Sequence, residues 1–206
     1  MSTLESMTEP ELLLLMRGEK PGEALSVSGE PSFREALTEL LLRQYDWLRR
    51  MCLLEFRYSQ EAEDCLQEVL IEISKSMKSF DGRSELKTWM YVIAKRTIYR
   101  VRKSARKREE RFPLGKKEDI GERDTLDAQV RDTESLLAEK EASRAIVRFI
   151  RSLPEQQRWA VFFHYFEDLS LEDTAARLNC SIGSVKKHLF RGRQKIKELL
   201  ESEEPA

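Results

Sequence analysis

Apolar side chains recur at every third or fourth position over most of the chain, the spacing of one face of an α-helix. The first long stripe begins at Phe33 and ends at Cys52, and it runs through Leu37, Leu40, Leu41, Tyr45 and Leu48. A second predicted helix spans about Gln60 to Met77, and a third begins at Ser84, a residue suited to an N-cap. No segment alternates apolar and polar residues with a period of two, so we expect an all-α fold.

Two stretches interrupt this pattern. Within residues 1–32 the apolar run Leu12–Leu15 is able to begin a short helix, but the Gly and Pro residues after it stop helices, so we predict a flexible N-terminal arm. Residues 112–134 are acidic and poor in large apolar side chains, the composition of a flexible linker. The sequence therefore predicts two small helical domains, over residues 33–111 and 135–200, and a C-terminal tail over residues 201–206.

The segment from Ser170 to Leu199 has the pattern of a helix-turn-helix. Ser170 with Asp173 resembles a capping box, and Asn179 stands where the turn needs a positive φ. Outward residues near the start of the second helix of such a motif meet base edges in the major groove. The candidates for contact with base edges are Ser184, Lys186, Lys187, Phe190 and Arg191, and the following Arg193 is a candidate for contact with phosphates.

Charge is strongly segregated, although 36 Lys and Arg nearly balance 37 Asp and Glu. Nine basic and two acidic residues lie between Lys95 and Arg111, and six basic and no acidic residues between Lys186 and Lys197. The two basic segments predict surfaces that bind a polyanion. An ordinary helical hairpin with a solvated basic face is the alternative for the second segment, but solvated faces usually mix charges of both signs.

Composition excludes several classes of protein. Three Cys without a C-x-x-C motif and only two His argue against a zinc site or a disulfide scaffold, and we expect no metal and no cofactor. The longest apolar run, Leu12–Met16, is too short to span a membrane, so we expect a cytoplasmic chain. No catalytic constellation is found, and we expect no enzyme activity of its own.

Five runs of residues resemble a known family. Residues 153–158 (LPEQQR), 165–170 (YFEDLS) and 184–193 (SVKKHLFRGR) are similar to region 4 of bacterial RNA polymerase sigma factors of the extracytoplasmic-function (ECF) group. Residues 61–69 (EAEDCLQEV) resemble region 2.2 of that group, and residues 86–95 (LKTWMYVIAK) the start of its promoter-recognition helix. The two blocks stand in the order of the family, and only a linker separates them.

The resemblance implies roles for particular residues. Region 2.2 docks on the largest subunit of core RNA polymerase, and the matching residues here are Glu61, Asp64, Gln67 and Glu68. The turn after it and the next helix contact the minus-ten promoter element, for which the candidates are Arg83, Ser84, Lys87, Arg96, Arg100 and Lys103. The helix-turn-helix residues named above would contact the minus-thirty-five element. Arg96 and Arg100 stand where the family often has Asn and Asp, which adds positive charge and leaves the usual base preference open.

The function that the resemblance implies is an ECF sigma factor: a free monomer that binds core RNA polymerase and promoter DNA, with an anti-sigma factor as a further partner. A stand-alone helix-turn-helix regulator that binds DNA as a dimer is the alternative, but it leaves the basic stripe at residues 96–107 unexplained. A helical adaptor that uses the acidic face is a third hypothesis, and it explains neither basic segment. Trp89 fits either the core or a base-stacking platform.

Overall fold

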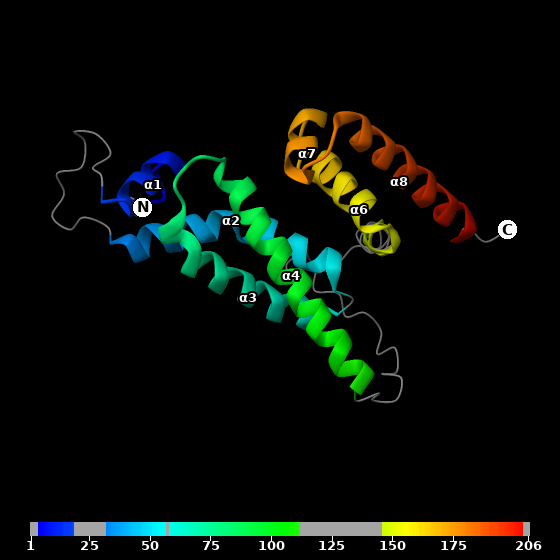
Figure 1. Ribbon diagram of the computed structural model, residues 1–206, viewed down its shortest axis with the longest axis horizontal. Coiled ribbons are helices and arrows are strands. Elements are labelled where there is room, and N and C mark those ends of the chain that lie inside the picture. Colours follow the sequence, from blue (N-terminus) through cyan, green and yellow to red (C-terminus); the bar gives the residue numbers. More distant parts are fainter. Residues whose placement is uncertain (1–3, 19–31, 57, 112–145, 204–206) are drawn as a thin grey trace, which may run out of the picture. The chain divides into compact units, whose positions relative to one another are not determined.

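The computed structural model describes residues 4–18, 32–56, 58–111 and 146–203 (Figure 1). Its regular elements in these ranges are helices and no strand occurs there, which confirms the predicted all-α class. The chain divides into two compact units, Met1–Phe112 and Pro113–Ala206. The predicted acidic linker over residues 112–134 and the expected start of the second domain at residue 135 lie outside the described residues.

The first unit is built on three long helices, α2 (Phe33–Glu55), α3 (Ser59–Ser76) and α4 (Leu86–Arg111). α3 packs against both α2 and α4, and the 3-10 turn η1 (Met77–Ser79) continues from its end (Figure 1). The helices share one core, in which the largest fully buried side chains include Leu40, Leu48, Met51, Leu66, Val69, Ile73 and Met90. Burying a side chain of this size stabilises the fold by roughly 1.5–3 kcal/mol.

α2 begins where the sequence predicts, because Ser32 forms a capping box with Glu35. The Glu35 backbone N–H donates to Ser32 Oγ at 3.3 Å, and Glu35 Oε2 accepts from the Ser32 backbone N–H at 2.7 Å. The buried stripe differs from the expected one: Tyr45 is exposed, whereas Gln44 and Trp47 are buried. α1, α3 and α4 all contact α2, so its buried surface is wider than one stripe at helical spacing.

Residues 4–18 are not the flexible arm that we predicted. Residues 9–16 form a helix, α1 (Glu9–Met16), that packs on α2 with Leu12 completely buried. The Arg43 guanidinium of α2 donates to the carbonyl oxygens of Met7 and Leu4, at 2.6 and 2.9 Å. The apolar run Leu12–Leu15 therefore belongs to a helix that packs on α2, a helix further along the chain. The remainder of the predicted arm falls in residues outside the described ranges, apart from Ser32.

The turn between η1 and α4 contains Asp81 and Gly82, as expected. Gly82 has a φ of 76°, which a glycine adopts without the strain of a Cβ. Asp81 accepts from the backbone N–H of Arg83 at 3.1 Å. We predicted Ser84 as the N-cap of the next helix, and this prediction is wrong. The Glu85 carbonyl accepts from the Trp89 backbone N–H at 3.1 Å, so α4 begins at Leu86, one residue later than a cap at Ser84 implies.

The second unit holds a helical segment over residues 146–152, then α6 (Glu155–Val161), the π-helical turn η2 (Phe162–Phe166), α7 (Leu171–Leu178) and α8 (Ile182–Glu203). α8 extends into the segment that we predicted as a tail from residue 201. α6 and α7 both pack on α8 (Figure 1), and the core between them includes Trp159, Phe162, Phe163, Ile150, Val185 and Leu189.

α7 and α8 form the predicted helix-turn-helix. The Asp173 backbone N–H donates to Ser170 Oγ at 3.0 Å, which caps α7. Asn179 has a φ of 52° and ends α7 in the left-handed conformation that Asn tolerates. Ser181 Oγ accepts from the Ser184 backbone N–H at 3.2 Å and so satisfies the first turn of α8. Each of these local signals was present in the sequence.

Gly192 lies in α8 where that helix approaches Val161 of α6. A Cβ at this position would lie 3.0 Å from Val161 Cγ2 and 3.6 Å from Leu153 Cδ1. Gly192 is buried in the middle of a helix, a position where glycine costs about 0.5–1 kcal/mol relative to alanine. The close approach of the two helices explains why a glycine stands there.

Candidate nucleic-acid and protein interfaces

The predicted docking residues gather on one face of α3, which we call the acidic face. Asp64, Gln67 and Glu68 are exposed, and Glu61 is half-buried at the start of the same face. Gln60 Nε2 donates to Asp64 Oδ1 at 3.1 Å, so the first turn of this face is ordered by its own side chains. Like charges on one face repel one another, which a basic partner surface would relieve.

The acidic face is also partly apolar. Ile71 lies seven residues after Asp64, two turns along the helix, and is exposed. An exposed isoleucine between charged side chains supplies apolar area to a docking surface. Periodicity alone did not indicate it, because a single outward apolar residue is common on helices.

Arg100, one of the predicted minus-ten residues, is turned toward the acidic face. Its Nη2 lies 3.1 Å from Glu68 Oε2 and 3.9 Å from Glu72 Oε1. The Arg100 and Glu68 side chains both remain more than half exposed, so the pair contributes little to stability. A DNA contact by Arg100 stays a prediction, and any such contact would compete with this ion pair.

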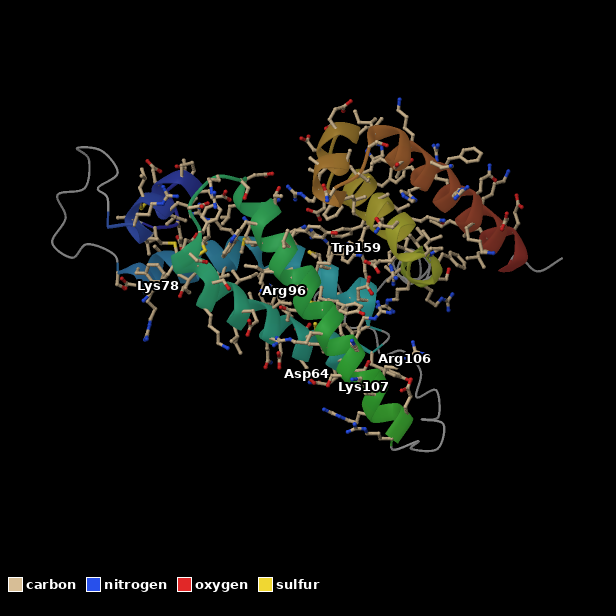
Figure 2. The ribbon with its side chains drawn as sticks, in the orientation of Figure 1. Asp64, Lys78, Arg96, Arg106, Lys107 and Trp159 are labelled. Atoms are coloured by element: carbon tan, nitrogen blue, oxygen red, sulfur yellow. The ribbon has the colours of Figure 1, made fainter. Side chains whose placement is uncertain are left out.

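The outward face of α4 carries apolar and basic residues in alternation. Val92, Arg96, Tyr99 and Lys103 follow at intervals of four, three and four residues, and all four are exposed. We call this set the α4 stripe. Figure 2 shows Arg96 midway along α4, with Arg106 and Lys107 further along the same helix and Asp64 on α3. Between Val92 and Lys103 the sequence contains no acidic residue, so the stripe is purely cationic in charge.

Lys87, another predicted minus-ten residue, lies on a different side of α4. Its Nζ lies 5.9 Å from the centroid of the Trp47 ring of α2, a cation–π distance, and the residue is half-buried. Burial and then the Glu85 carboxylate raise the pKa of Glu9 in α1, and the Lys87 charge acts against that rise. Lys87 thus belongs to the junction of α1, α2 and α4, apart from the α4 stripe.

Arg83 and Ser84 occupy the exposed turn before α4. Arg83 Nε lies 2.5 Å from Asp81 Oδ2, and hydrogen bonding from the Arg83 backbone, more than its charge, lowers the pKa of Asp81. Trp89 is half-buried with its ring centroid 5.1 Å from that of Phe80. Its ring packs on Phe80 but is not fully buried, so the core and base-stacking interpretations of Trp89 both stay predictions.

The predicted minus-thirty-five residues lie along α8. Lys186, Lys187, Arg191 and Arg193 are exposed, and so is the Phe190 ring among them. Ser184 is different, because its Oγ lies 2.9 Å from Ser181 Oγ and joins the cap of the helix. A base contact by Ser184 stays a prediction, whereas the other five side chains project from the helix into solvent.

The two cysteines of the first unit are buried structural residues. Cys52 in α2 and Cys65 in α3 have no exposed surface. A hydrogen bond with the Cys65 side chain, together with burial, raises the pKa of the Cys52 thiol well above its ordinary value. A thiol held protonated in this way is a poor nucleophile and a poor metal ligand. Within the described ranges, no group of three or more His, Cys, Asp or Glu is placed to hold a metal ion.

Comparison with known protein families matches each unit to one model. The model of Sigma-70 region 2 matches residues 40–108, and the model of Sigma-70, region 4 matches residues 143–196. The ECF RNA polymerase sigma-E factor of Escherichia coli (strain K12) is 30% identical over 145 residues, which cover 67% of this chain and 73% of that protein. The RNA polymerase sigma-H factor of Pseudomonas aeruginosa is 29% identical over 144 residues, which cover 69% of this chain and 75% of that protein.

Solved structures that share the fold include the following two. The sigma factor RpoE of Bartonella quintana, solved with the anti-sigma factor NepR, matches with a TM-score of 0.59 and 24% identity over 81% of this chain and 98% of that one. CnrH, solved with the cytosolic domain of CnrY, matches with a TM-score of 0.58 and 16% identity over 83% of this chain and 91% of that one. With both sigma-70 regions matched in order and a sigma-E relative at this identity, the chain belongs to the ECF RNA polymerase sigma factors. Among its described helices, none is long and apolar enough to cross a membrane.

Proposed function

We propose that this protein docks on core RNA polymerase through the acidic face of α3 and directs the enzyme to promoters. In this proposal α8 contacts the minus-thirty-five element, and the minus-ten element is contacted by residues of the turn and of α4, namely Arg83, Ser84, Lys87, Arg96, Arg100 and Lys103. The polymerase carries out the chemistry. The observation that carries the proposal is the match of region 2 and region 4, each to its own folded unit and in the order of the family.

The charges on the two units support this assignment. α3 presents carboxylates for a basic partner, whereas α4 and α8 present cations for a polyanion. A stand-alone helix-turn-helix regulator would bind DNA through α7 and α8 and use the first unit for dimerisation or sensing, which leaves the basic residues of α4 at 96–107 unexplained. We also propose that the free chain is a monomer in the cytoplasm, where the polymerase acts.

An anti-sigma factor is a further proposed partner. RpoE, a relative in fold, was solved in complex with an anti-sigma factor. CnrH, a second relative in fold, was solved in complex with the cytosolic domain of CnrY. A partner of this kind would mask the acidic face, the α4 stripe or α8.

Gel filtration with core RNA polymerase tests the proposal. The chain alone should elute as a monomer, and the mixture should elute as one complex that starts transcription from promoters that core polymerase alone ignores. A dimer that does not associate with core polymerase would support the regulator instead. The matched variant is Asp64→Lys, with Asp46→Lys on α2 as an exposed acidic control away from the acidic face.

A further inference from the structure

We infer that Tyr99 is a base-stacking residue for promoter DNA that has been opened into single strands. The inference rests on the proposed function and adds to it a residue that neither the charge pattern nor the family motif indicated. Tyr99 is 63% exposed at the middle of the α4 stripe. An exposed tyrosine ring does not contribute the stabilisation that a ring of this size gives when it is buried in the core.

The neighbours of Tyr99 along the helix are cations. Arg96 precedes it by three residues and Lys103 follows it by four, the two spacings at which side chains of a helix are neighbours. Single-stranded DNA is bound by this combination, because cations track the phosphates while aromatic rings stack on successive bases. A single exposed tyrosine does not indicate a DNA-binding site. The position of Tyr99 between two cations, in a stripe without an acidic residue, does indicate one.

The other aromatic side chains near the predicted minus-ten site are already engaged. Trp89 packs on Phe80, Trp47 lies under Lys87, and Tyr91 is buried at 3% exposure. Tyr99 is therefore the ring that α4, as described from residue 86 to 111, presents to solvent. Val92, two turns earlier on the stripe, is 59% exposed and offers an apolar contact of the kind that a thymine methyl group makes.

The occupant that this chemistry favours is single-stranded DNA and not a protein. Duplex DNA keeps its bases stacked on each other, so a ring on the protein surface gains access to a base face only after the strands separate. A protein partner would be expected to bring carboxylates to the cations and an apolar side chain to Tyr99, and the test below includes this outcome.

Three substitutions separate stacking from other roles of the ring. Tyr99→Phe keeps the aromatic face and removes the hydroxyl, Tyr99→Leu keeps apolar volume and removes the aromatic face, and Tyr45→Leu is the control. Tyr45 is also exposed, but it lies on α2 away from the stripe. Because both positions are exposed, the fold should persist in all three variants, and circular dichroism checks it.

The probe is a short single-stranded DNA selected from a random pool on the wild-type holoenzyme and labelled with fluorescein. Holoenzyme with Tyr99→Leu should bind it about 5- to 150-fold more weakly, the loss of one base–aromatic stack, whereas Tyr99→Phe and Tyr45→Leu should bind within about 2-fold of wild type. Aminopurine placed at each position of the probe should be quenched at one position by the wild type and Tyr99→Phe, and this quenching should disappear with Tyr99→Leu.

Other outcomes overturn the inference. Equal affinity of wild type and Tyr99→Leu means that no base stacks on the ring, and an equal loss in Tyr99→Phe and Tyr99→Leu means that the hydroxyl forms the contact. If Tyr99→Leu binds DNA normally but loses binding to an anti-sigma protein, the stripe is a protein interface. Failure of the wild-type chain to associate with core polymerase or to select any DNA would instead contradict the proposed function, so the two failures are distinguishable.

Discussion

Arg100 on α4 lies 3.1 Å from Glu68 on α3, so one ion pair joins the helix that we assign to DNA with the helix that we assign to the polymerase. The sequence separates the two charges into an acidic face and a basic stripe. The structure places them against each other. A cation of the polymerase that approaches Glu68 would therefore meet a carboxylate whose charge Arg100 already offsets in part.

We predict that Arg100 moderates docking on the polymerase. Arg100→Ala should bind core polymerase as well as or better than the wild type, whereas Glu68→Ala should bind it more weakly, because removal of Arg100 exposes the full charge of Glu68. The coupling energy in the double variant should be about 0.2–1 kcal/mol, as for other exposed pairs. Titration of core polymerase with labelled protein measures it. A coupling of zero would mean that the pair is absent in solution.

Asp64→Lys should weaken docking while the fold is kept. Asp64 is exposed, and surface substitutions of this type change stability by about 0.5 kcal/mol or less. Its pairing with Gln60 is local, so the substitution leaves the ion pair of Arg100 intact. Affinity for core polymerase, with Asp46→Lys as the charge-matched control, tests the acidic face. Equal affinities of the two variants would show that docking uses another surface.

On α8, we predict that Arg191 contacts a base and Arg193 contacts the phosphate backbone. Arg191→Ala should cost about 1–3 kcal/mol on the preferred promoter and relax the choice at one base pair. Arg193→Ala should weaken all promoters by a similar factor and lower the slope of the salt dependence by about one unit. Transcription by the holoenzyme from promoters that differ by one base measures both effects. If both variants shift every promoter equally, α8 contacts only the backbone.

Arg102 lies in the basic segment, but it forms an ion pair within the first unit. Its Nη1 pairs with Glu55 Oε2, and the Glu55 side chain is only 2% exposed. Arg102→Ala leaves a buried carboxylate without this cation, and we expect a loss of about 1–3 kcal/mol in the free energy of unfolding. Urea unfolding followed by circular dichroism measures it. Arg106→Ala on the same helix, whose pair with Glu110 is exposed, is the control and should be nearly neutral.

Gly192 should tolerate no large side chain. A valine at this position would press on Val161 and Leu153, and overpacking of this kind costs about 1–3 kcal/mol. Gly183→Ala is the control, because its nearest contact would be Ser181 Oγ at 3.8 Å. Urea unfolding followed by the fluorescence of Trp159, which is buried in the same unit, measures the difference. Equal stability of Gly192→Val and wild type would contradict the close packing of α6 and α8.

Local features of this protein follow from the sequence. The periods of apolar residues predicted the helices and their class, and the caps at Ser32 and Ser170 and the left-handed Asn179 lie where local rules place them. These features need only neighbours within a turn or two along the chain. For the same reason the acidic face of α3 and the outward cations of α8 were predictable, since residues at helical spacing share a face wherever the helix packs.

Tertiary structure decided which way the remaining residues point. α1 docks on α2, where residues distant in the sequence bury Leu12. Arg100 pairs with a carboxylate of α3, and Arg102 pairs with a carboxylate of α2. Lys87 lies on the ring of Trp47, whereas Tyr99 remains exposed to water. Each of these outcomes depends on a partner in another helix. A one-dimensional pattern of charge cannot distinguish a cation that pairs within the fold from one that is free for DNA, because the two differ only in what the neighbouring helix presents to them.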